Sequence, residues 1–125
     1  MSAVFLNTDL TLKATFDLQP LVGALWILGL VLIGDDVKVS SVWTATLESN
    51  LVRPSLETSA DELLTAVENL RALDRVAWQQ CIVRLFDVGF QASYDTFELA
   101  IQVGNPLVTR IASVGASLGL SIYQG

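Results

Sequence analysis

The chain has 125 residues, 52% of them hydrophobic and only 16% charged, with a formal net charge of −6. This length suits one domain, residues 1–125, that can bury its own core. Its seven basic residues are scattered singly and it has no histidine. These features argue against a nucleic-acid surface and exclude Ser-His and Cys-His catalysis and histidine-containing zinc sites.

Residues 9–17 alternate between apolar and polar side chains, which predicts a strand with one face on the core. The next stretch, 21–33, has no charged or polar side chain. It is shorter than the roughly 20 residues that cross a bilayer and has no flanking lysine or arginine. We therefore expect a core element: a helix over about 18–28 that buries Trp26, then an extended segment to Gly34.

Gly34, Asp35 and Asp36 indicate a turn. Residues 37–48 alternate again and predict a second strand, which places Trp43 in the core. The alternation breaks at Ser41 and Val42, where a β-bulge would account for it.

Two helices are predicted next. Ser59 and Glu62 match a capping box at the start of the first, whose apolar stripe continues through Leu63, Val67 and Leu70. Asp74 is a candidate cap for the second, with Gly89 at its end and an apolar stripe at Trp78, Ile82 and Leu85. A strand over 81–86 is the competing interpretation. Cys81 lies among apolar neighbours, so we expect a buried, unreactive thiol.

The rest of the chain predicts an extended segment, a helix and a closing strand. Residues 91–103 are expected to be extended, and Asn105 and Pro106 to begin a helix that Gly115 ends. Residues 117–123 alternate, which places three residues inward (Leu118, Leu120, Ile122) and four outward (Ser117, Gly119, Ser121, Tyr123).

Together these elements predict an α+β fold. Strands with one polar face, mixed with amphipathic helices, favour a mainly antiparallel four-stranded sheet with the helices packed on one face. The nearest simple topology is a ferredoxin-like β-α-β-α-β-α-β variant.

The C-terminal pattern resembles the bacterial family of domains of unknown function numbered 4279. The residues that carry the resemblance are Phe97-Glu98-Leu99, residues 107–118 with Gly115-Ala116-Ser117-Leu118, Leu120-Ser121-Ile122-Tyr123, and residues 43–49 with Trp43. The apolar run 21–33 departs from the family's more polar helix. The resemblance covers about two thirds of the chain and implies a small bacterial α+β domain without an assigned site. Some small acidic bacterial proteins of this kind look similar to toxin-immunity proteins, which is an analogy only.

Candidate chemical groups have simpler structural explanations. Asp35 and Asp36 are more typical of a solvated turn than of a cation site, which would need further oxygen ligands at fixed spacing. Glu57, Asp61 and Glu62 suit the first turn of a helix. Nothing in the sequence brings Asp87 and Asp95 together as a catalytic pair. We therefore predict no catalytic residue, cofactor or metal, and no enzymatic activity.

The leading functional hypothesis is a non-catalytic protein-interaction domain, either an inhibitor or immunity-like protein or a subunit of a homo-oligomer. The low charge and high apolar content favour it. The alternative is a small-ligand-binding domain with a pocket lined by residues 21–33. We expect a cytoplasmic protein that binds a protein partner or itself, and neither nucleic acid nor membrane. The candidate partner-binding residues are Tyr123, Ser121, Asp35, Asp36 and Trp78.

Overall fold

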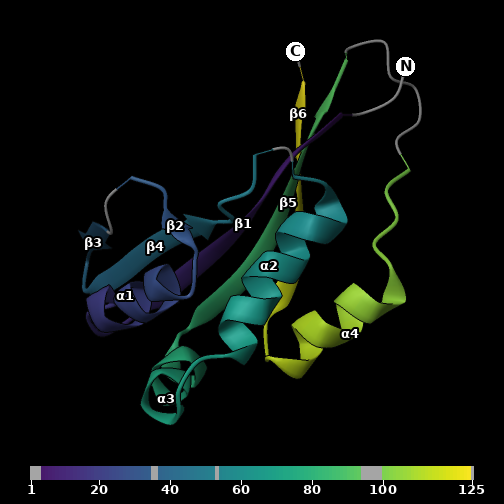
Figure 1. Cartoon of the computed structure of the whole chain (residues 1–125). Helices are drawn as coiled ribbons and strands as arrows, with labels where there is room; N and C mark the ends of the chain where they lie inside the picture. The colour runs from purple at the N-terminus through teal and green to yellow at the C-terminus, as the bar shows by residue number, and fades with distance from the viewer. Residues whose placement is uncertain (1–3, 35–36, 53, 94–99, 125) are drawn as a thin grey trace.

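The computed structural model describes residues 4–34, 37–52, 54–93 and 100–124. These residues form an α+β fold with four helices and one six-stranded sheet (Figure 1). The strands are β1 (Val4–Ala14), β2 (Val31–Leu32), β3 (Val37–Val39), β4 (Val42–Glu48), β5 (Val83–Ala92) and β6 (Ser117–Gln124). The helices are α1 (Gln19–Ile27), α2 (Leu56–Glu68), α3 (Ala72–Gln80) and α4 (Asn105–Ser113).

The strands are ordered β2-β4-β1-β5-β6, with β3 also paired to β4. All pairs are antiparallel except β5 and β6, which run parallel because the connection through α4 returns the chain to the same end of the sheet. The predicted α+β class is confirmed. The four-stranded sheet and its ferredoxin-like order are wrong, since the sheet has six strands and is mixed.

One face of the sheet joins the helices in a single core. On β1 the buried residues are Leu10, Leu12 and Ala14, which lie beside Leu47 of β4 and Phe86 of β5. The helices supply further apolar side chains, among them residues of α1 (Leu21, Val22, Leu25), α2 (Leu63, Leu64, Val67), α3 (Trp78) and α4 (Leu107, Ile111). None of the helices in the described part of the chain is both long and apolar enough to cross a membrane.

The apolar run 21–33 is only partly buried. The helix predicted over 18–28 is present as α1, but Trp26 is 66% exposed and not in the core. The reason is that α1 buries Leu21, Val22 and Leu25 in the core, which leaves Trp26 and Ile27 exposed. Trp43 is half-buried and packs against the core, with the Lys38 Nζ 5.3 Å from its ring centroid.

The strand predicted over 37–48 is a hairpin without a bulge. β3 and β4 pair with each other, and Ser40 and Ser41 form the two-residue turn with φ of 50° and 68°. Two positive φ angles are what a tight hairpin turn requires. The turn explains the break in alternation at these residues. The neighbouring Asp35 and Asp36 lie outside the described residues.

The capping box of α2 begins at Ser55 and not at Ser59. The Ser55 hydroxyl accepts from the Thr58 N–H at 3.1 Å, and the Thr58 hydroxyl accepts from the Ser55 N–H at 2.9 Å. Ser59 lies one turn inside the helix and is buried, where its hydroxyl oxygen lies 2.9 Å from Thr8 Oγ1 and 2.7 Å from the Ser55 carbonyl oxygen. It therefore ties α2 to β1 and does not cap the helix.

The second predicted helix, from Asp74 to Gly89, is wrong in its second half. α3 ends at Gln80 and the chain continues as β5, so the competing strand at 81–86 is the better prediction. Asp74 lies inside α3, whose N-cap is Arg71. After Gln80 the chain becomes extended at Cys81, with φ of −60° and ψ of 140°, and the Ile82 N–H donates to the Lys13 carbonyl of β1 at 2.8 Å. The Arg84 Nη1 lies 2.8–3.1 Å from the carbonyls of Trp78, Gln79 and Cys81 and helps to end α3, because it supplies a donor to carbonyls that a further helical turn would have used.

The C-terminal elements follow the prediction more closely. α4 begins at Asn105, although its N-cap is Gly104, and Gly115 follows its end with φ of 74°. β6 occupies the predicted closing strand, at the edge of the sheet. Of the extended segment predicted over 91–103, residues 94–99 lie outside the described residues and 100–103 have no regular structure.

Candidate protein-interaction surface

β6 is the long free edge of the sheet. It pairs with β5 on one side, and no other strand in the described residues pairs with its second side. The opposite edge of the sheet is formed by β2 and β3, which have only two and three residues. Since an unpaired strand presents a row of free N–H and C=O groups, the second side of β6 can accept another strand.

The start of β6 is held in place by the turn that precedes it. The Trp78 Nε1–H donates to the Val114 carbonyl at 2.8 Å, and the Arg84 Nε–H donates to the Gly115 carbonyl at 2.9 Å. The positive φ of Gly115 suits glycine, and the Ala116 N–H donates to the Ile111 carbonyl at 3.1 Å. These contacts fix the point from which β6 leaves α4.

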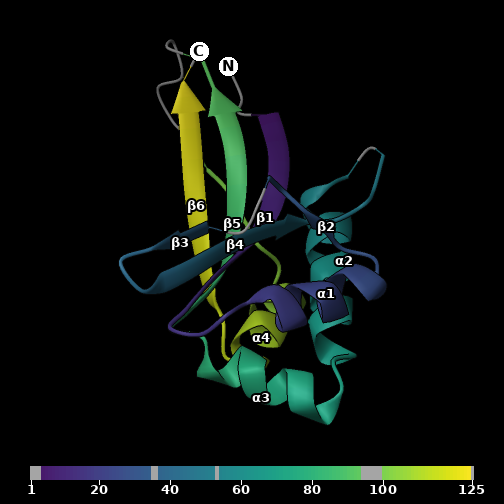
Figure 2. The same cartoon turned by 90° about the vertical axis from the view of Figure 1, so that its left-hand side faces the viewer.

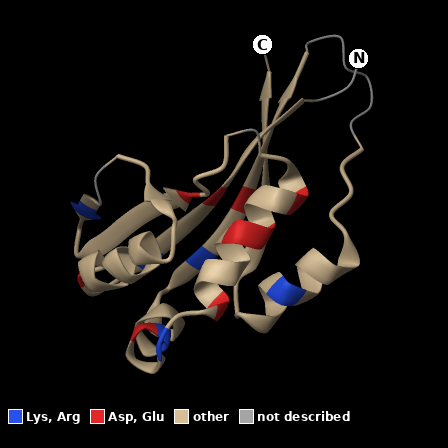
Figure 3. Ribbon diagram, viewed as in Figure 1, with Lys and Arg blue, Asp and Glu red and all other residues tan. Residues whose placement is uncertain are grey.

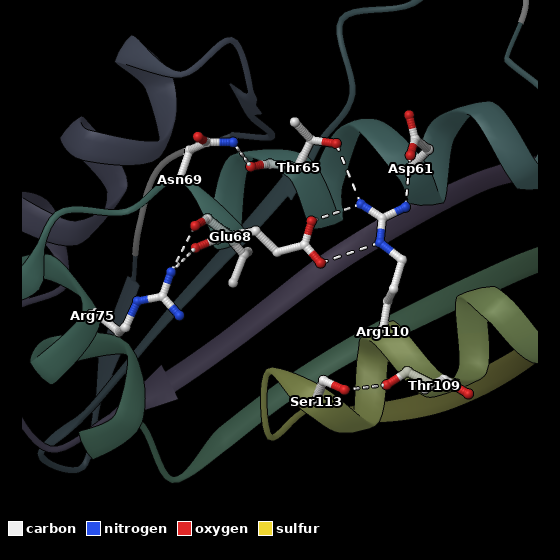
Figure 4. Close-up of polar contacts among 9 residues, drawn as sticks. Asp61, Thr65, Glu68, Asn69, Arg75, Thr109, Arg110 and Ser113 are labelled. Atoms are coloured by element: carbon white, nitrogen blue, oxygen red, sulfur yellow. Dashed lines mark hydrogen bonds and ion pairs between the residues drawn. The ribbon is translucent and has the colours of Figure 1, made fainter.

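Arg110 attaches α4 to α2 (Figure 4). Its guanidinium lies 2.7 Å from a carboxylate oxygen of Asp61 and 2.8 Å from one of Glu68. These two acceptors, with Glu68 contributing most, raise the pKa of Arg110 further above its usual value. Asp61 therefore belongs to an interhelical ion pair, and it lies beyond the first turn in which sequence analysis placed it.

The inner face of β6 carries an apolar stripe, which is defined here as Leu118, Leu120 and Ile122. In the parallel register these residues lie opposite Phe86, Val88 and Phe90 of β5, so they share the sheet face that bears the helices. Their inward direction agrees with the alternation, but they are 37%, 50% and 41% exposed. The ends of β1, β5 and β6 nearest the chain termini project beyond the helices (Figures 1 and 2), which leaves the stripe partly uncovered.

The outer face of β6 is polar or small. The Ser121 hydroxyl lies 2.9 Å from both carboxylate oxygens of Asp87 on β5, to which it donates. Tyr123 is exposed, and its ring lies beside Gly89, where an added Cβ would be 3.6 Å from the Tyr123 Cε2 and 2.7 Å from the Asn7 Oδ1. Glycine at this position therefore leaves room for both side chains.

Three carboxylates lie in a row across the outer face of the sheet. Asp9 of β1 pairs with Glu48 of β4 on one side and Asp87 of β5 on the other. Burial, together with the negative charges of Glu48 and Asp87, raises the pKa of Asp9 to about 6. Within the described ranges no group of three or more His, Cys, Asp or Glu could hold a metal ion. The row therefore concentrates negative charge on this face of the sheet.

The structure brings together only some of the predicted partner-binding residues. Ser121 and Tyr123 lie on the same face of β6, as the alternation predicted. Trp78 is 2% exposed and belongs to the core, so it cannot contact a partner in this conformation. Asp35 and Asp36, and Asp95 of the weighed carboxylate pair, fall outside the described residues. The buried position predicted for Cys81 is confirmed, and burial raises its pKa to about 11.

The exposure of the apolar stripe was not predicted from the sequence. Alternation shows which residues share a face of a strand, but not whether a helix covers that face. A usable signal was present in the composition, since residues 117–124 contain neither a charge nor a proline. Edge strands ordinarily carry charged residues or proline, which prevent pairing with another strand.

A hollow of about 380 Å³ lies at the end of α1, lined by Ala24, Ile27, Leu28, Asn69, Arg71 and Asp74. Three of these six lining residues, Ala24, Ile27 and Leu28, belong to the apolar run 21–33. The volume of the hollow is at the lower end of the range for ligand sites.

Comparisons with protein-family models, curated proteins and solved structures found no match to this chain.

Proposed function

We propose that this chain is a non-catalytic protein-interaction domain that binds by adding a strand to the free edge of β6. The observation that carries the proposal is an eight-residue edge strand with no charge, no proline and an exposed apolar stripe. The sequence of β6 contains no charged residue, whereas α2 carries several acidic ones (Figure 3). Main-chain hydrogen bonds would supply affinity and the stripe would supply specificity.

Two further observations support an interaction role. The sequence has no histidine, and its one cysteine is buried with a raised pKa, so the two commonest side-chain nucleophile activations are missing. The strand is also firmly positioned, since Trp78 and Arg84 hold the turn before it. Binding to a pre-formed edge loses little conformational freedom on the protein's side.

The resemblance to the family numbered 4279 and the analogy to immunity proteins remain predictions. An inhibitor or immunity-like role would use the same edge to accept an extended segment of another protein. A homo-oligomer subunit would use it to accept a second copy.

The test compares two substitutions of the same chemistry. Leu120→Lys places a charge on the free edge, and Leu73→Lys places one on α3, where Leu73 is 85% exposed. Both proteins, with the wild type, are measured for self-assembly after purification and for capture of partners from the native host. We expect Leu120→Lys to lose an association that Leu73→Lys retains. Equal behaviour of the two variants in both assays would contradict the use of β6.

A small-ligand-binding domain is the second candidate, supported by the hollow at Ala24, Ile27 and Leu28. The test is mass spectrometry of the small molecules released when protein purified from the native host is denatured. A stoichiometric small molecule that the wild type releases and that Ile27→Lys lacks would favour this function.

A further inference from the structure

We infer that the strand added to β6 is β6 of a second copy, antiparallel about a two-fold axis, with Leu120 opposite Leu120 of the other chain. This inference rests on the proposed function and names its partner. It predicts a symmetric dimer with one continuous sheet of twelve strands, six from each copy.

The first step is geometric. A two-fold axis perpendicular to a sheet makes the joined edge strands antiparallel and keeps the same face of each sheet on the same side. Along such a pair, the numbers of facing residues add to a constant. The residue at the two-fold axis therefore faces the same residue of the other copy. Since paired residues share a face, the apolar stripes of both copies lie together on the side that bears the helices.

The second step concerns register. When Leu120 faces Leu120, Leu118 faces Ile122 and the stripe is complementary to itself. On the outer face, Ser117 then lies opposite Tyr123, and Gly119 opposite Ser121. Each aromatic ring therefore meets a small side chain. This register pairs residues 117–123, which are seven of the eight residues of β6. When the paired numbers add to 242 instead, residues 118–124 pair over the same length, but Leu118 then lies opposite Gln124 and no longer opposite an apolar residue. When they add to 238, the ladder shortens to residues 117–121.

The third step is electrostatic. Two chains of net charge −6 repel each other, but residues 117–124 add no like charges at the contact. The carboxylate nearest along the outer face, Asp87, already accepts the Ser121 hydroxyl. Added salt should therefore strengthen the dimer by screening the general repulsion. A contact with a basic partner would weaken under the same change, so the salt response distinguishes the two.

The opposite edge of the sheet, formed by β2 and β3, does not offer a comparable contact. β2 and β3 are too short to form a comparable ladder, and β3 carries Lys38. Among the described residues, β6 is the longest unpaired edge, with eight residues. The side of β1 that faces β4 is also unpaired over residues 4–8, but that stretch is shorter. A second copy offers an edge of equal length with a matching apolar stripe.

A contact built from one strand pair and three apolar side chains per copy is smaller than a standard interface of about 1,600 Å². We therefore expect a reversible dimer with a Kd of order micromolar. Sedimentation of the purified wild type over about 1–200 µM should show the mass rising from one to two chains. Raising NaCl from about 50 to 500 mM should lower the Kd.

The matched variants test the surface. Leu120→Lys should raise the dimer Kd by at least about tenfold, because two lysines would face each other at the axis, whereas Leu73→Lys should change it less than about twofold. Circular dichroism of each variant checks that the fold is retained. An intact Leu120→Lys protein that dimerises as tightly as wild type would overturn the inference.

Cysteine cross-linking tests the register, in a Cys81→Ser background. Leu120→Cys should form a disulfide with itself on mild oxidation, since facing Cα atoms in an antiparallel pair lie about 4.5–5.5 Å apart. Leu118→Cys should cross-link with Ile122→Cys when the two proteins are mixed, but not with itself. Self-cross-linking at position 118 without cross-linking at 120 would overturn the register.

These results separate this inference from the proposed function. A chain that stays monomeric at all concentrations, yet loses a captured host protein on Leu120→Lys, overturns the dimer and leaves strand addition standing. A chain that dimerises equally well as wild type, Leu120→Lys and Leu73→Lys overturns the dimer through β6. It contradicts strand addition as well when both variants also capture the same host proteins.

Discussion

Asp9 should make the protein more stable as the pH falls from about 8 to about 4. In the folded chain, burial, Glu48 and Asp87 raise the pKa of Asp9 from 3.8 to about 6. Because the folded pKa lies above the unfolded one, folding takes up a proton at this carboxyl. The stabilisation is therefore fully present below about pH 4 and is lost as the pH rises through about 6.

The size of the effect follows from the same values. A pKa difference of about two corresponds to about 3 kcal/mol. Asp9 is only partly buried, so water screens the interaction, and we expect about 1–2 kcal/mol. Asp9→Asn, which removes the charge at nearly constant shape, should therefore raise the free energy of unfolding by about 1–2 kcal/mol at pH 8. The gain should shrink to near zero at pH 4.

Urea denaturation of both proteins at several pH values measures this difference directly. Taking the difference between variant and wild type cancels the titration of carboxyls far from Asp9. Glu48→Gln is the matched control, since it removes one neighbouring charge and should give a smaller gain in the same direction. A variant-minus-wild-type difference that is negative at pH 8, or that does not change with pH, would refute the reasoning.

Three further substitutions test the contacts that position β6 and α2. Ser59→Ala should lower the free energy of unfolding by about 1–2 kcal/mol in urea denaturation, because it leaves the buried Thr8 hydroxyl without its 2.9 Å partner; no loss would mean that the hydroxyl finds another partner. Arg84→Met should cost about 2 kcal/mol in the same assay, because four carbonyls lose a charged donor; an unchanged midpoint would contradict its role in ending α3. Arg110→Met should cost at most about 1 kcal/mol, since its partner Glu68 is partly exposed, and the loss should diminish in high salt; a salt-independent loss would point to packing instead.

The sequence was most informative where one face of an element is polar. The alternation over 9–17 and 37–48 identified β1, β3 and β4 because their outer faces carry threonine, lysine and acidic residues. α2 was found for the same reason. Its start was misplaced because Ser55 and Ser59 offer the same capping chemistry, and only the fold shows which hydroxyl is buried against Thr8.

The predictions were wrong where the local pattern of apolar and polar residues does not distinguish one face of an element, or one type of element, from another. Trp26 was assigned to the core because residues 21–33 are apolar on every side, so periodicity could not identify the exposed face of α1. The spacing of Trp78, Ile82 and Leu85 fits a helix, but Arg84 helps to end α3 and the chain becomes β5. In both cases contacts far apart in sequence decided the structure.

The candidate surface on β6 could be predicted only in part, because it also depends on contacts between distant segments. The shared face of Ser121 and Tyr123 follows from alternation alone. The edge position of β6 depends on which strands pair with β5, and pairing between distant segments is not encoded in the strand itself. For this reason the exposure of Leu120 appears only in the fold.

Amide hydrogen exchange of β6 at two protein concentrations tests the central claim most directly. If β6 accepts β6 of a second copy, amides of residues 117–123 that point away from β5 should exchange slowly at about 200 µM and quickly at about 1 µM. The exchange rates of the amides of α1 and α3 should not depend on protein concentration. β6 amides that exchange equally fast at both concentrations, or protection confined to the exposed side of α1 around Trp26, would contradict the account.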